Sequence, residues 1–158
     1  MDKERLKKKF KKGDKKAFNL IYEQYCDAMY VICLRYTKNE DEAADILQDA
    51  FIRIYEKRQL FDPKYDLSAW IKKIVINEAI NHYRVNKKFE LVEDDTYFEE
   101  SIDLEEQFEI EVSNDTHRVL LKMIQELPPG YQAVFNMYVM DNLTHKEIAD
   151  YLNVSINT

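Results

Sequence analysis

The sequence contains few helix-breaking residues and no segment that could cross a membrane. It has 2 Gly and 3 Pro in 158 residues, so tight turns are few and an all-α fold is expected. The longest apolar run, Ala28 to Leu34, is far shorter than the roughly 20 residues that a transmembrane helix needs. No apolar segment follows the N-terminal lysines, so we expect no signal peptide and a cytoplasmic location.

Cysteine and histidine, the usual soft metal ligands, are also scarce. Cys26 and Cys33 are seven residues apart on a predicted helix, about 10 Å along its axis, which is too far for a disulfide. His82, His117 and His145 are scattered and have no ligand spacing. No nucleophile–base pair or phosphate-binding loop is recognisable, so we expect no metal, no cofactor and no enzymatic activity.

The net charge of −7 conceals a separation of the two signs along the chain. Residues 1–90 contain 20 Lys/Arg and 15 Asp/Glu, whereas residues 91–158 contain 3 and 15. A protein that binds DNA by itself is usually basic, because phosphate contacts supply much of the affinity. If this acidic chain binds DNA, we therefore expect something else to contribute much of the binding.

Hydrophobic periodicity predicts two helical units. Helices at about 14–37, 40–58 and 67–88 would form the first unit, residues 1–88, with Phe18 and Tyr22 facing its core. The lysine-rich residues 3–16 would add a short helix or a mobile arm. Eleven acids with no Lys or Arg lie between Glu90 and Glu111, which predicts an extended or partly helical linker over 89–114. Helices near 115–126, 130–140 and 144–152 would form the second unit, residues 115–158.

One face of the predicted 67–88 helix has the composition of a nucleic-acid-binding surface. Cations, amides and one indole recur on it at helical spacing, with no acid among them: Trp70, Lys73, Asn77, Asn81, Arg84 and Lys88. Cations bind phosphates, amides read base edges and an indole stacks on an unpaired base. A solvated basic face, with Trp70 in the core, is the alternative, and the stripe alone does not decide between them.

The predicted 40–58 helix has an apolar residue on its acidic side. Ile52 would lie among Asp45, Gln48, Asp49 and Glu56, opposite a core face that includes Ile46 and Ile54. An isoleucine surrounded by carboxylates and an amide indicates a docking site for a basic protein. An isolated exposed isoleucine is also common, so other features have to support this interpretation.

Residues 144–158 match the first part of a helix-turn-helix. Thr144 and Glu147 form a capping box, Ala149 is small enough for close helix packing, and Asn153 suits the turn. The recognition helix would begin at about Ile156, so the sequence holds only its first residues and this unit should make few base contacts. Many helical hairpins share this pattern.

Five blocks, in this order, resemble the extracytoplasmic-function sigma factors of the sigma-70 family. They are Asp14-x-x-Ala17-Phe18, the run from Glu42 to Phe51, Leu67-Ser68-Ala69-Trp70-Ile71, Ile124-x-x-Leu127-Pro128, and the run from Thr144 to Ala149. The resemblance implies a region 2-like domain (1–88), an acidic linker (89–114) and a region 4-like helix-turn-helix domain (115–158). It also implies a promoter-specificity subunit of RNA polymerase, regulated by an anti-sigma factor.

The same resemblance implies roles for individual residues. The core polymerase would be bound by Asp45, Gln48, Asp49 and Ile52. The −10 element would be melted and read by Phe61, Tyr65, Trp70, Lys73, Asn77, Asn81 and Arg84. The −35 element would be contacted, in part, by Thr144, Lys146, Ser155, Asn157 and Thr158. A stand-alone helix-turn-helix regulator and a protein-interaction module remain the alternatives.

Overall fold

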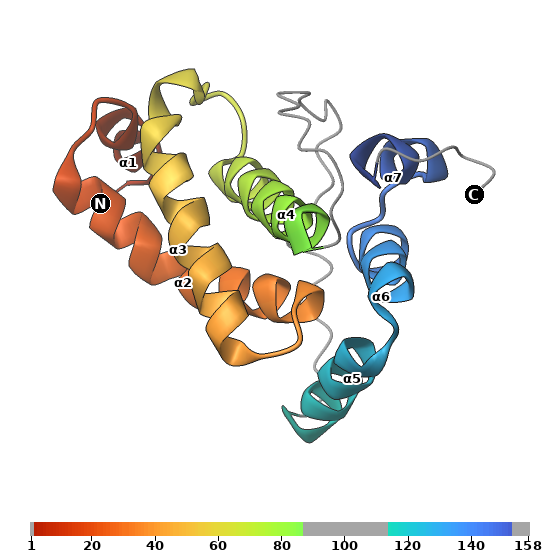
Figure 1. Ribbon diagram of the computed structural model, residues 1–158. Helices are drawn as coiled ribbons and strands as arrows, with labels where there is room; N and C mark the ends of the chain where they lie inside the picture. Colours follow the sequence, from red (N-terminus) through yellow and green to blue (C-terminus); the bar gives the residue numbers. More distant parts are fainter. Residues whose placement is uncertain (1, 87–113, 153–158) are drawn as a thin grey trace.

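The computed structural model describes residues 2–86 and 114–152, and within these two ranges it is helical, with no strand (Figure 1). The expected all-α fold is confirmed. The first unit contains α1 (Lys3–Lys11), α2 (Lys15–Tyr36), α3 (Glu40–Glu56), the 3-10 turn η1 (Arg58–Leu60) and α4 (Leu67–Asn86). The second contains α5 (Asn114–Glu126), α6 (Pro129–Phe135), the π-helical turn η2 (Asn136–Met140) and α7 (His145–Leu152). None of the described helices is long and apolar enough to span a membrane.

Three helices begin at side-chain caps, and the one at Thr144 is the cap that the sequence analysis predicts. The Ala17 amide donates to the Asp14 carboxylate at 2.9 Å, and the Glu42 amide donates to the Asn39 side chain at 2.9 Å. At the start of α7, the Glu147 amide donates to the Thr144 hydroxyl at 3.2 Å. Each bond satisfies an amide that the first helical turn leaves without a backbone partner.

The lysine-rich N-terminal segment forms a helix, α1, that is anchored by one aromatic residue. Phe10 is fully buried, and its ring centroid lies 6.4 Å from Phe18, 6.4 Å from Phe61 and 6.1 Å from Trp70. This contact decides between the two alternatives for residues 3–16: their first part is a docked helix. Lys3 and Lys8 of that helix are exposed, whereas Lys7, Lys9 and Lys11 are half-buried.

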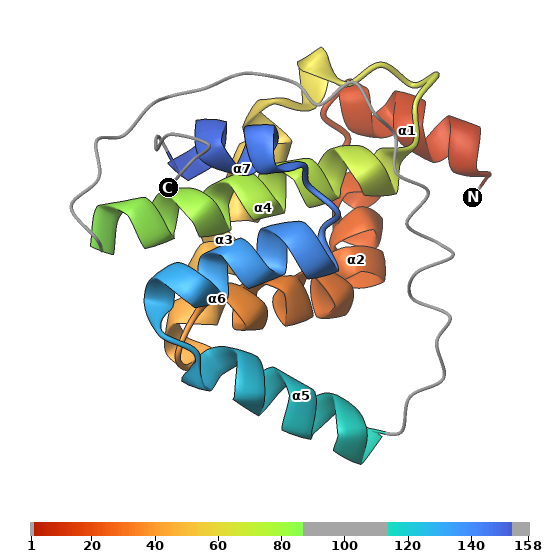
Figure 2. The ribbon, with the colours of Figure 1, turned by 90° about the vertical axis from the view of Figure 1, so that its right-hand side faces the viewer.

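Helix α4 of the first unit lies at the boundary with the second unit, as Figures 1 and 2 show. On one side it packs against α2 and α3, and on the other side against α7. Every α4 residue from Ile71 to Ile80 is buried or half-buried. The predicted stripe is therefore less exposed than expected: Trp70, Lys73 and Asn77 are half-buried, and Trp70 packs on Phe10 and Phe61 of the first unit.

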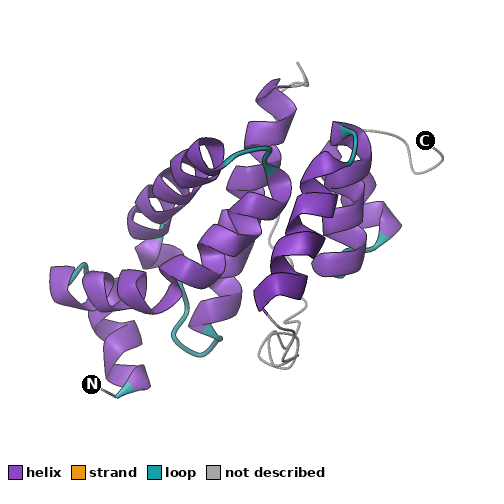
Figure 3. Ribbon diagram, turned by 90° about the horizontal axis from the view of Figure 1, so that it is seen from below, coloured by secondary structure: helices purple, strands orange, loops and turns teal. Residues whose placement is uncertain are grey.

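The two units share one apolar core. Figure 3 shows the helices of the two units side by side. Met137, Leu143, Ile148 and Leu152 of the second unit belong to the same buried cluster as the core residues of α2, α3 and α4. The predicted linker, residues 89–114, lies outside the described residues except for Asn114, where α5 begins. Cys26 and Cys33 are both free thiols, as their spacing predicts.

Candidate protein and nucleic-acid interfaces

An apolar groove of about 680 Å³ lies between α2 and α3. Most of its lining is aromatic or aliphatic: Phe18, Tyr22, Tyr30, Ala44, Leu47, Gln48, Phe51, Ile52, Tyr55 and Glu56. Its aromatic rings pack on one another, with Tyr22 and Phe51 at 4.8 Å and Phe18 and Tyr55 at 5.1 Å between centroids. Such mutual packing fixes the shape of the groove before any partner arrives.

Four residues singled out as a docking site face solvent along α3. Asp45, Gln48, Asp49 and Ile52 are all exposed, and Gln48 and Ile52 also line the groove. Ile52 is 50% exposed, whereas Ile54, two residues on, is completely buried. Sequence reasoning missed the aromatic half of this surface. It placed Tyr22 in the core, but 43% of that residue is exposed.

The rim of the groove is acidic. The exposed carboxylates of Asp45, Asp49 and Glu56 surround its α3 side. Close by, Glu78 of α4 forms an ion pair with Arg53, and burial raises the pKa of the Glu78 carboxyl, against the effect of Arg53. An apolar groove with an acidic rim favours a partner that offers apolar side chains among cations.

The loop before α4 is held by short-range hydrogen bonds from two aspartates. The Lys64 amide donates to the Asp62 carboxylate at 3.0 Å, and the Ser68 hydroxyl donates to that of Asp66 at 2.6 Å. Tyr65 projects from this loop and is 68% exposed, so its ring is free to stack on a base. In contrast, Phe61 is 1% exposed and packs on Trp70 at 5.2 Å, so in this structure it is a core residue.

The polar residues of the predicted α4 stripe lie together but are partly covered. Lys73, Asn77 and Asn81 are half-buried along one side of the helix. Burial lowers the pKa of the Lys73 ammonium, and the carboxylate of Glu147 on α7 opposes that shift. The side chain of Arg84, and all of Lys88, lie outside what the structure describes. The polar residues of the stripe therefore share one partly covered side of α4, and α7 packs against this helix.

Part of the predicted −35 contact set is visible at the start of α7. Thr144 and Lys146 are exposed there, and the Thr144 hydroxyl donates to the Glu147 carboxylate at 3.2 Å. Ser155, Asn157 and Thr158 lie outside the described residues. Among the described residues, no group of His, Cys, Asp and Glu side chains could hold a metal ion.

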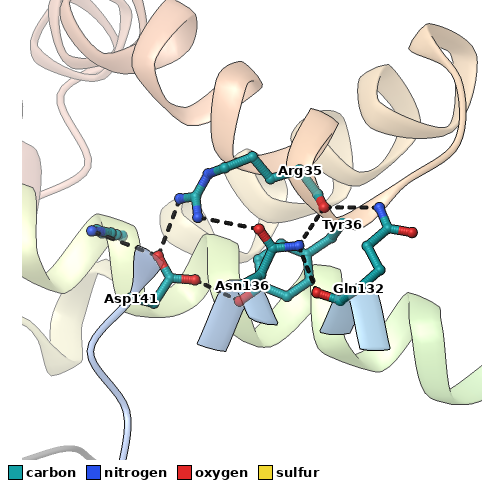
Figure 4. A network of polar contacts seen from close by, with 6 residues as sticks. Arg35, Tyr36, Gln132, Asn136 and Asp141 are labelled. Carbon is teal, nitrogen blue, oxygen red and sulfur yellow. Dashed lines mark hydrogen bonds and ion pairs between the residues drawn. The ribbon is translucent and has the colours of Figure 1, made fainter. Parts of the chain in front are cut away.

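A buried polar network, which the sequence analysis did not predict, joins the two units (Figure 4). At its centre the Asp141 carboxylate accepts hydrogen bonds from Arg35 at 3.1 Å and from the Tyr36 hydroxyl at 2.5 Å. Lys72 of α4 lies 3.9 Å from the same carboxylate. Burial raises the pKa of the Tyr36 phenol well above its usual value, and the charge of Asp141 raises it further.

Two amides extend this network along the C-terminal end of α2. Gln132 donates to the carbonyls of Arg35 at 2.9 Å and Thr37 at 3.0 Å. The side-chain amide of Asn136 donates to the Arg35 carbonyl and accepts from its guanidinium at 3.5 Å. Asp141, Gln132 and Asn136 lie more than 90 residues from their α2 partners in the sequence, so the residues around each of them do not predict these contacts.

The capped α7 helix after α6, together with an α4 side bearing a cation and amides, indicates a helical transcription protein of the helix-turn-helix class. Two family models match the chain: Sigma-70 region 2 over residues 21–89 and Sigma-70, region 4 over residues 117–158. The ECF RNA polymerase sigma factor SigW of Bacillus subtilis is 32% identical, over 100% of this chain and 88% of SigW.

Other known proteins agree. SigM of Bacillus subtilis is 27% identical over 85% of this chain and 81% of SigM. The ECF sigma-E factor of Escherichia coli K12 is 25% identical over 97% of this chain and 84% of that protein. Among solved structures, CnrH in complex with the cytosolic domain of CnrY has a TM-score of 0.53 and 16% identity, over 99% of this chain and 86% of CnrH, a likeness in fold alone.

The chain belongs to the ECF sigma factors of the sigma-70 family, the RNA polymerase subunits that direct promoter-specific transcription initiation. This confirms the resemblance carried by the five sequence blocks.

Proposed function

We propose that this sigma factor docks on core RNA polymerase through the α2–α3 groove and its acidic rim. The observation that supports this best is the half-exposed Ile52 inside an apolar groove flanked by Asp45 and Asp49. A surface isoleucine contributes little to folding where it stands, but it becomes an anchor when a partner removes it from water. Exposed acids around it steer a basic partner and fix its orientation.

We also propose two promoter-reading surfaces, formed by residues that do not line the α2–α3 groove. Tyr65 and the α4 residues Lys73, Asn77 and Asn81 offer a stacking ring, a cation and two amides for the −10 element. These groups offset part of the roughly few kcal/mol that unstacking a base costs. We propose that Thr144 and Lys146, which are exposed at the start of α7, contact the −35 element. Phe61 supports the loop from the core and is not assigned a base contact.

An anti-sigma factor is the third partner that we propose. Both units expose apolar side chains that no described residue covers. In the first unit they line the α2–α3 groove, and in the second they are Val119, Leu120 and Met123 on α5. A protein that bridges these two surfaces would block polymerase docking. Acting as an initiation subunit, the protein would carry out no reaction of its own, and we expect it to be cytoplasmic.

Co-elution with purified bacterial core RNA polymerase tests the docking surface. We expect the wild-type chain to co-elute and the variant Asp45→Lys/Asp49→Lys to be lost from the complex. The matched control, Asp115→Lys/Glu126→Lys, makes the same change of charge at two exposed acids of α5 and should still bind. Equal binding by both variants would exclude α3 as the interface.

The same preparation separates the two alternative classes of protein. A stand-alone regulator would bind duplex DNA tightly without polymerase. A pure interaction module would bind polymerase yet give no promoter-dependent transcript. A sigma factor needs the polymerase for promoter recognition and opens the promoter with it.

A further inference from the structure

We propose that helix α1 is a binding surface for the phosphates of single-stranded DNA, placed to hold the promoter strand where it leaves Tyr65. Tyr65 and α4 contact the bases, and α1 contacts only the sugar-phosphate backbone. The path of the strand rests on the proposed function of Tyr65 and α4, whereas the phosphate-binding surface depends on α1 alone.

The cations of α1 are far denser than the folding of this helix requires. The nine residues from Arg5 to Gly13 contain six cations and no acid. Cations four residues apart, such as Lys8 and Lys12, repel each other along a helix and destabilise it. The helix dipole favours cations in the last turn of α1, but it disfavours Arg5, which lies in the first turn. This arrangement therefore favours a negatively charged partner.

Helix α1 is fixed on the first unit, so its cations have a defined position. The Asp14 amide donates to the Lys9 carbonyl at 3.1 Å, and this bond ends the helix. The Gly13 amide donates to the Phe10 carbonyl at 2.9 Å, which completes a Schellman motif. Gly13 has a φ of 88°, a conformation that side chains disfavour, and the ring of Phe10 is fully buried.

The outer cations of α1 have no acid of this chain to neutralise them. Lys7 is paired with Glu4 at 3.1 Å. Arg5, Lys8 and Lys12 are exposed, and none of them forms an ion pair within the described ranges 2–86 and 114–152. Spacings of three and four residues place these three cations along one side of α1 and its C-terminal cap. They form a basic stripe that faces solvent.

The stripe lies next to the loop that leads into α4, as Figure 2 shows. The Lys7 ammonium donates to the Pro63 carbonyl at 3.4 Å, and the exposed residues Lys64 and Tyr65 follow Pro63 directly. A strand that follows α4 from Asn81 toward the start of the helix reaches Tyr65 and then α1. Sites for single-stranded DNA combine stacking rings with cations along the backbone, and the loop and α1 supply both.

A membrane, the other extended acidic surface, does not suit α1. A basic helix binds a bilayer by placing an apolar face among the acyl chains. In α1 that face is already used, because Phe10 is completely buried and Leu6 packs against the same core. Only the cations remain accessible, and α1 is about 13 Å long, which is enough to pass several phosphates of a DNA strand.

Two matched charge variants of the full chain test this surface. Arg5→Gln/Lys8→Gln removes one arginine and one lysine from α1. The control, Arg118→Gln/Lys122→Gln, removes the same two residue types from α5, and all four side chains are exposed. Both variants therefore change the net charge equally, and circular dichroism verifies that each is folded.

Each chain is titrated into a fluorescent oligo(dT) of about 15 nucleotides, at several salt concentrations from about 50 mM upward. We expect the α1 variant to bind at least about fivefold more weakly than the wild type at about 50 mM salt. The slope of log affinity against log salt should decrease by about 1.4, because each phosphate contact on a single strand contributes about 0.7. The α5 control should keep the wild-type slope.

A third variant separates this inference from the proposed function. Tyr65→Ala removes a ring and no charge, so it should weaken oligo(dT) binding and leave the salt slope unchanged. If Tyr65→Ala binds as the wild type does while the α1 variant loses its slope, the phosphate surface is supported and only the proposed role of Tyr65 is contradicted.

Three results would overturn the phosphate surface. The first is a wild-type chain that shows no oligo(dT) binding at about 50 mM salt. The second is an equal loss in the α1 and α5 variants, which would show that net charge alone is responsible. The third is an α1 variant that keeps oligo(dT) binding but loses binding to vesicles of phosphatidylglycerol and phosphatidylcholine, which would identify a membrane surface.

Discussion

Two isoleucines on α3 allow docking to be separated from folding. Ile54 is 0% exposed, and truncating such a side chain to alanine costs about 2–5 kcal/mol of unfolding free energy. Ile52 is 50% exposed in the groove, so its truncation should cost the fold less than about 1 kcal/mol. The exposed half of Ile52 would instead lose about 1–2 kcal/mol in the complex, which weakens the Kd for core polymerase roughly 5- to 30-fold.

The assay pairs urea unfolding, followed by circular dichroism, with fluorescence anisotropy of labelled protein titrated with core polymerase. Ile52→Ala should shift the binding curve and leave the urea midpoint almost unchanged. Ile54→Ala should do the reverse, provided that binding is measured at a temperature where it is folded. If Ile52→Ala binds polymerase as the wild type does, the groove is not the docking site and the reasoning from exposure fails.

Three further predictions concern other parts of the molecule. Asn77→Ala/Asn81→Ala should retain polymerase binding and lose promoter opening, measured by permanganate reactivity of unpaired thymines. Phe10→Ala should release α1 at a cost of about 3–5 kcal/mol and change Trp70 fluorescence, since the rings are in contact. Burial raises the pKa of the Cys33 thiol to about 12 from 9.0, so stability present below pH 9 is lost as the pH rises toward 12. In alkaline urea titrations, Cys33→Ala should lack this loss, about 2–3 kcal/mol near pH 11.

Sequence reasoning succeeded where the interaction is local. The Thr144 cap was predicted because it bonds to a residue three positions later, and the caps at Asp14 and Asn39 have the same local spacing. The exposed position of Ile52 also follows from helical periodicity, because the opposite face of α3 is continuously apolar. The five sequence blocks together identified the family of the protein, which no single motif did.

Sequence reasoning failed where contacts join distant segments. Arg35 and Asp141 are 106 residues apart, and each resembles an ordinary surface charge when only its neighbours are considered. The same limit explains Phe61, whose place beside Phe10 and Trp70 depends on the docking of α1. The partial covering of α4 was missed for the same reason. A helix that remote elements cover on two sides has the same polar stripe in its sequence as a helix covered on one side.

The separation of charge along the chain is reflected in contacts between the two units of the folded structure. Residues 91–158 carry 15 acids and 3 cations, and the folded chain brings Asp141 and Glu147 against Lys72 and Lys73 of α4. In the proposed function DNA phosphates attract Lys73, so Glu147 and nucleic acid would compete for the same cation. Such competition weakens binding to arbitrary DNA, most of whose free energy comes from phosphate contacts.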